Sequence, residues 1–269
     1  MLRKISQVIA VLVLLLLPFY PITENFFPPE KQVNNQTFWQ YIAICTAIIL
    51  VGLLFIVFLK PNRALAGWLL FFLGFSAMIP LHLGPPRMGG DLLTSTGIEQ
   101  FRYGMLIVAT VLLFVAGLRI ITPAKDILSK ILLGILLGTL LLNLWDNHSS
   151  FVLGPELKSW MDKGKNPDDF FTQYDFHIAW RTLARISLYV TAIAIAWILL
   201  KKSILKKWQF AALTIFSLIG IVCCIRCLQT DFRDFYFPFM VPAIALAPAY
   251  WIGITMLCKK ETTGGKIHA

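Results

Sequence analysis

Stretches of about 20 mostly apolar residues recur eight times along this chain of 269 residues. Such a stretch suits a helix that crosses a hydrocarbon core of about 30 Å, whereas the strands of a membrane barrel are shorter and alternate in polarity. Hydrophobic residues make up 58% of the chain and charged residues only 14%, while soluble domains carry about 25% charged residues. The sequence therefore predicts an all-α, polytopic integral membrane helix bundle that forms a single domain over residues 1–269. The eight predicted spans are Ile5–Ile22, Phe38–Leu59, Leu65–Leu83, Phe101–Ile121, Ile127–Trp145, Ile178–Leu200, Trp208–Leu228 and Phe235–Cys258.

The distribution of charge orients these spans. If the N-terminus is cytoplasmic, the segments on the inner side carry 14 of the 24 Lys and Arg residues but only two of the 14 acidic residues, Asp126 and Glu261. Cytoplasmic loops of membrane proteins show this excess of Lys and Arg. We therefore expect both termini in the cytoplasm and a bacterial inner membrane as the location. Contact with anionic headgroups explains the net charge of +10, so we expect membrane lipids, and no nucleic acid, as partners.

The first span begins like a signal peptide, because Arg3 and Lys4 precede its apolar run. Residues 18–21 read Pro-Phe-Tyr-Pro where a small-residue cleavage site would stand, so we expect a retained helix. The largest extracytoplasmic loop is predicted at residues 146–177. Its aromatic residues favour the membrane interface, which predicts a lid or a short interfacial helix there.

A stripe of three side chains marks the point where this loop enters the sixth span. His177, Arg181 and Arg185 recur every four residues, so they share one side of a helix. The apolar run Ile186–Leu200 gives only about 22 Å, which is shorter than the bilayer core, so Arg185 must enter the membrane. Snorkelling to the headgroups is the favoured explanation for Arg181. For Arg185, such anchoring and an anion-binding wall, with Asp175 or a substrate phosphate as partner, are equally open.

Further ionisable side chains fall at the same predicted depth, at the outer ends of other spans. A set of His, Asp and Arg at one level could bind a phosphate headgroup or perform acid–base chemistry. Every span carries polar residues where it leaves the membrane, however, so only lateral clustering would identify a site. For Arg226 we expect a mainly structural salt bridge to Asp231, Asp234 or Asp146. The candidate substrate-binding residues are His82, Asp146, His148, Asp175, His177, Arg181, Arg185, Arg226 and Asp231.

The histidines and cysteines do not match a metal or redox motif. His82, His148 and His177 lack the spacing of zinc or haem ligands. Cys224 and Cys227 form a C-x-x-C, but cysteine also serves as a small apolar packing residue in membrane helices, and we favour that role. We therefore predict neither a metal nor a cofactor.

Glycine and proline residues indicate where helices pack closely and where one breaks. Gly134 and Gly138 form G-x-x-x-G in the fifth span, a close-packing face for another helix of this chain or for a partner subunit. Pro238, Pro242 and Pro248 should kink or break the eighth span.

Three functions of different classes follow from these features. The favoured one is an outward-facing polar, cationic pocket that binds or modifies an anionic, lipid-linked substrate. The second is a non-catalytic subunit or assembly factor of a larger membrane complex, joined through the face formed by Gly134 and Gly138. The third is a small-solute transporter that works around the broken eighth helix. The sequence leaves open whether the protein is an enzyme.

Overall fold

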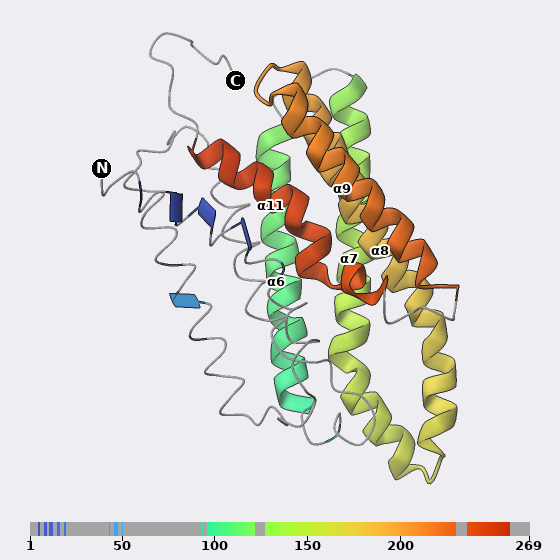
Figure 1. The fold of residues 1–269 in the computed structure, drawn as a ribbon. Helices are drawn as coiled ribbons and strands as arrows, with labels where there is room; N and C mark the ends of the chain where they lie inside the picture. Colours follow the sequence, from blue (N-terminus) through green and yellow to red (C-terminus); the bar gives the residue numbers. More distant parts are fainter. Residues whose placement is uncertain are drawn as a thin grey trace.

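A computed structural model describes residues 96–121, 127–229 and 236–258, together with isolated positions before residue 94; the side chains of residues 171–177 are outside this description. Every element in these ranges is helical, which confirms the all-α prediction for this part of the chain (Figure 1). The first three predicted spans and both termini lie outside the described residues. In chain order the elements are α6 (Thr96–Ile121), α7 (Ile127–Asp162), α8 (Pro167–Lys201), α9 (Lys207–Arg226), the 3-10 helix η3 (Phe237–Met240) and α11 (Pro242–Cys258).

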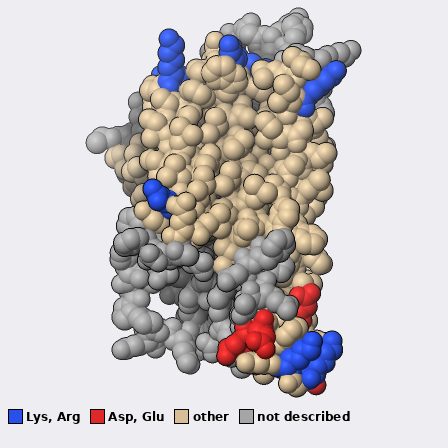
Figure 2. All heavy atoms as spheres, turned by 90° about the vertical axis from the view of Figure 1, so that its right-hand side faces the viewer, with Lys and Arg blue, Asp and Glu red and all other residues tan. Residues whose placement is uncertain are grey.

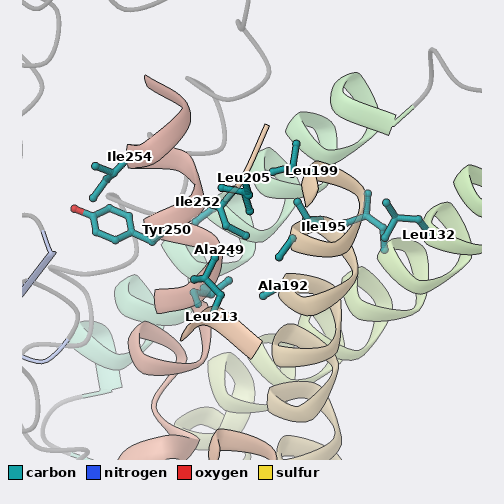
Figure 3. Close-up of a cluster of buried hydrophobic side chains, with 14 of the residues drawn as sticks. Leu132, Ala192, Ile195, Leu199, Leu205, Leu213, Ala249, Tyr250, Ile252 and Ile254 are labelled. Atoms are coloured by element: carbon teal, nitrogen blue, oxygen red, sulfur yellow. The ribbon is translucent and has the colours of Figure 1, made fainter. Parts of the chain in front are cut away.

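The helix α8 is the centre of this bundle. It contacts α7, α9 and α11, while α6 packs against α7 on the other side. Buried apolar side chains from all five long helices form one continuous cluster, part of which is drawn in Figure 3. Small residues, such as Ala192 and Ala196 of α8 and Ala249 of α11, lie in this cluster. Small side chains let helix backbones approach closely, which is how helices associate where lipid removes the hydrophobic driving force.

Among the described residues, three helices are long and apolar enough to cross a membrane: α7, the Ile178–Lys201 part of α8, and α9. Large apolar side chains such as Leu141 and Ile215 are exposed on their outer surfaces. Figure 2 shows that charged side chains gather at the two ends of the visible face, with few between them. A soluble protein rarely exposes so much apolar surface, so the described helices belong to a membrane protein.

The segment predicted as the largest extracytoplasmic loop, residues 146–177, is mostly helical. Helix α7 continues past Trp145 to Asp162, and α8 already begins at Pro167. The turn is short because Gly164 adopts a φ of +71°, a conformation that glycine reaches without strain. Asn166 then caps α8 by accepting a hydrogen bond from the Asp168 N–H at 3.0 Å. At 36 residues, α7 is about 54 Å long and exceeds the bilayer core.

The eighth predicted span is broken, as its prolines predict. The 3-10 helix η3 ends at Met240, Val241 is extended (φ −69°, ψ 125°), and α11 starts at Pro242. Pro242 occupies the first helical position, where its missing N–H costs nothing. The break leaves backbone carbonyls without helical partners, and these take part in the site described next.

Candidate functional site

Asp146 of α7 and two arginines of α8 form a buried ionic cluster, which we call the Arg–Asp–Arg cluster. Arg181 Nε donates to Asp146 Oδ1 at 3.0 Å, and Arg185 Nη2 donates to Asp146 Oδ2 at 2.6 Å. The side chains of Asp146 and Arg185 are only 4% and 3% exposed, whereas that of Arg181 is 16% exposed. Each carboxylate oxygen therefore binds a different guanidinium, and Arg181 lies nearest the surface.

Arg185 also joins α8 to the broken helix. Its Nε donates to the Met240 carbonyl at 2.8 Å, and its Nη1 donates to Asn143 Oδ1 at 3.1 Å. The neighbouring Phe239 carbonyl accepts from Tyr189 Oη at 3.2 Å and from Cys224 Sγ at 3.5 Å. Side chains of α8 and α9 thus donate hydrogen bonds to backbone carbonyls that the break leaves without helical donors.

The polar contacts continue along the α7–α8 interface towards the other end of the bundle. Asn143 Nδ2 donates to the carbonyls of Thr139 at 2.8 Å and Ala184 at 3.3 Å. The hydroxyls of Thr139 and Thr191 are 2.8 Å apart and share a hydrogen bond. Beyond Asp146, Ser150 Oγ accepts from Arg181 Nη2 at 2.7 Å.

A helical spacing explains why these residues of α7 meet α8. Thr139, Asn143, Asp146 and Ser150 are separated by three or four residues, so they lie on one side of the helix. All four are buried. Of these four residues, only Asp146 was among the predicted site residues. The recurrence of polar residues every three or four positions in an apolar helix is the sequence signal for the other three.

Distances along α8 indicate the depth at which the cluster would lie in a membrane. At 1.5 Å per residue, Arg185 lies about 24 Å from Lys201 along α8, and Arg181 lies about 30 Å from Lys201. If the lysines of the α8–α9 connection mark one surface of a core of about 30 Å, Arg181 lies at the opposite surface and Arg185 about 6 Å inside it. A charge at this depth is tolerated because Asp146 pairs with it.

The geometry identifies one partner of the two arginines. Among the described side chains, the acid that binds Arg181 and Arg185 is Asp146. The side chain of the expected partner Asp175 lies outside the description, and a substrate phosphate stays a prediction. Arg181 binds inside the bundle instead of snorkelling freely to the headgroups. Arg226 is exposed and donates to Gln229 Oε1 at 3.1 Å, so its expected salt bridge to Asp146 is wrong.

The remaining candidates are not part of the described cluster. His148 is exposed, although it follows Asp146 by only two residues, because that spacing turns it to another side of α7. His82 and Asp231 lie outside the described residues, as does Asp234. The side chains of Asp175 and His177 are also outside the description.

A second buried ion pair on α6 was not anticipated. Arg102 Nη1 donates to Glu99 Oε1 at 3.1 Å, and both side chains are buried. Thr110 of α6 accepts a hydrogen bond from Asn147 Nδ2 at 3.2 Å. Charged residues three apart at the start of an apolar run are the sequence signal for such a pair.

The face formed by Gly134 and Gly138 is open in the described structure. A Cβ atom added to either glycine would meet no atom within 4 Å. The described helices of this chain therefore do not pack closely on it. Docking of a partner subunit on this face stays a prediction.

The cysteines have the environment of packing residues. Cys223, Cys224 and Cys227 are buried and form no disulfide with one another. Among the described residues, no group of three or more His, Cys, Asp or Glu side chains is placed to hold a metal ion.

Chemically, the cluster suits electrostatic binding better than proton transfer by Asp146. Both oxygens of this carboxylate accept charge-assisted hydrogen bonds, which favour its ionised form and leave it poorly placed as a general base. Guanidinium groups, in contrast, match the geometry of phosphate and carboxylate oxygens. No protein-family model, curated protein or solved structure matches the chain.

Proposed function

We propose that the chain is an eight-span protein of the bacterial inner membrane with both termini in the cytoplasm, and that its outward-facing cationic site binds or modifies an anionic, lipid-linked substrate. The α8–α9 connection, with Lys201, Lys202, Lys206 and Lys207, is then cytoplasmic. The hairpin of α7 and α8 extends from the outer surface of the bilayer.

The observation that carries this proposal is the different exposure of the two arginines. Two guanidinium groups share one carboxylate, and Arg181 retains exposed surface at the predicted level of the outer headgroups. Arg185 holds the site together through Asp146, Asn143 and the Met240 carbonyl. An anionic headgroup approaching from the outer leaflet would reach Arg181 first and would gain a charge-assisted hydrogen bond.

The test is native mass spectrometry of the full chain extracted gently from its own membrane. We expect the wild-type protein to retain a phosphate-bearing lipid that Arg181→Gln loses. Arg226→Gln is the matched control, because Arg226 is an exposed arginine near the same end of the bundle but outside the cluster. Equal retention in all three proteins would contradict the proposal, and so would an equal loss in both variants.

A non-catalytic subunit is the second candidate, favoured by the open face at Gly134 and Gly138. Two glycines one turn apart let a partner helix approach closely in a membrane. This function predicts that a partner polypeptide copurifies at fixed stoichiometry and that Gly138→Leu removes it. An unchanged complex in Gly138→Leu would count against this candidate.

A further inference from the structure

An apolar groove opens on the surface between α7, α8 and the first turn of α9. Its volume is about 270 Å³, and it is lined by Leu128, Ile131 and Ile135 of α7, Val190 and Trp197 of α8, and Phe210 of α9. Ile131 is 54% exposed and Trp197 is 41% exposed, so the groove faces the surroundings of the bundle. It lies near the lysine-rich end, away from the Arg–Asp–Arg cluster.

Positive charge surrounds the end of the groove where the α8–α9 connection lies. Lys201 Nζ is 5.0 Å from the centroid of the Trp197 ring, and that ring packs against Phe210 at 5.9 Å. Lys206 and Lys207 are exposed at the start of α9. Residues 127–145 and 186–229 contain no Asp or Glu, while Asp126 lies outside the described residues.

We propose that this groove binds one anionic phospholipid, with an acyl chain along the groove and the phosphate at Lys201. The apolar walls exclude a polar ligand, and the lysine rim matches a negative headgroup at the membrane surface. Tryptophan and lysine side chains are typical of that boundary. The lipid site is separate from the proposed outer site and does not depend on it.

The length of the groove favours a lipid over a helix of another protein. Leu128 and Ile135 are seven residues apart, or about 10 Å along α7, and Val190 lies about 16 Å from Lys201 along α8. A partner helix would pack over most of a bilayer core of about 30 Å. A groove that begins at the basic end and stops near mid-bilayer matches one acyl chain entering from one leaflet.

The test measures which lipid stays with the full-length protein. The purified protein is exchanged into nanodiscs that contain equal amounts of phosphatidylglycerol and phosphatidylcholine, released, and weighed by native mass spectrometry. In an Arg181→Gln background, which removes binding at the proposed outer site, we expect one retained lipid with a clear preference for phosphatidylglycerol. Lys201→Gln should lower that preference by about fivefold, the effect of one basic group near an anionic surface. Lys165→Gln is the matched control, because Lys165 Nζ lies 4.2 Å from the Trp160 ring centroid in the connection between α7 and α8.

A second pair of variants tests the acyl chain. Ala194 lines the groove, so Ala194→Phe should fill it and abolish retention of either lipid, while Leu141→Phe on the exposed surface of α7 should not. Lys201→Gln keeps the test decisive if Ala194→Phe fails to fold. Bound lipid in the same ratio as the nanodisc would identify annular lipid only and overturn the proposal. A stoichiometric polypeptide retained in place of lipid, and lost in Ala194→Phe, would overturn it as well.

Discussion

Replacement of Asp146 by asparagine tests whether this carboxylate holds the α7–α8 interface together. Each oxygen accepts from a different arginine, at 3.0 Å from Arg181 Nε and 2.6 Å from Arg185 Nη2. Asparagine preserves the size of the side chain but removes the negative charge. It also replaces one acceptor by an NH₂ group that would face a guanidinium donor. Two positive charges would then share a site with no described acid between them.

The structure sets the expected size of the effect. Removal of one partner from a buried ion pair costs about 3–5 kcal/mol, because the other charge stays buried without compensation. The more exposed Arg181 contributes less to this cost, since water solvates part of its charge. Arg185 keeps Asn143 and the Met240 carbonyl but no described acid. We therefore expect Asp146→Asn to lower the free energy of unfolding by about 3–4 kcal/mol.

Buried thiols provide the assay. Cys223, Cys224 and Cys227 are at most 8% exposed, so a thiol-reactive dye reports their exposure as the protein unfolds in detergent. The assay uses a background in which Cys45→Ser and Cys258→Ser remove the other two cysteines. Asp162→Asn, at an exposed position at the end of α7, is the control and should change stability by less than about 0.5 kcal/mol. If Asp146→Asn unfolds like Asp162→Asn, the carboxylate does not compensate the arginines and our reasoning is refuted.

Two further predictions use the same assay. A Cβ on Gly220 would overlap the Tyr189 ring, so Gly220→Ala should destabilise the protein by about 1–3 kcal/mol. A Cβ on Gly134 would meet no atom within 4 Å, so Gly134→Ala should be neutral or stabilising by up to about 1 kcal/mol. Similar stability of these two variants would contradict the packing argument. Thr139→Val removes the hydrogen bond between the Thr139 and Thr191 hydroxyls, which are 2.8 Å apart, and should lower the free energy of unfolding by about 1 kcal/mol. Unchanged stability would show that this hydrogen bond contributes nothing.

The apolar pattern predicted the membrane helices better than their extensions. Hydropathy predicted the start of α7 at Ile127 and the start of α9 to within one residue. The prolines of the eighth span predicted the break before α11. Hydropathy did not predict that α7 continues beyond Trp145, because it detects only apolar segments that can lie in lipid. Buried Leu153 and Leu157 pack there with Phe170. Two leucines four residues apart are typical of a helix, and this signal was overlooked when residues 146–177 were interpreted as a loop rich in aromatic residues.

The candidate site was only partly predictable for a related reason. The length of the apolar run required Arg185 to enter the membrane, and the structure buries it. Its partner Asp146 is 39 residues away in sequence, and its predicted place in a loop hid their convergence. Of the three acids expected as partners of Arg226, Asp146 is excluded, because shared depth does not imply lateral contact, while Asp231 and Asp234 lie outside the described residues. Only the packing of α7 on α8 distinguishes these pairings.

The break before α11 bears on the choice between a transporter and a site with fixed structure. In a transporter, carbonyls freed by a broken helix coordinate the transported solute. Here the Met240 carbonyl accepts from Arg185, and the Phe239 carbonyl accepts from Tyr189 and Cys224. A solute that used the Met240 carbonyl would have to displace a donor that also binds Asp146, and disruption of such a buried pair costs about 3–5 kcal/mol. The break therefore favours a fixed contact that positions the Arg–Asp–Arg cluster over a pathway that opens to both sides. Labelling of Val241→Cys from both membrane faces would reverse this argument, while access from one face would support it.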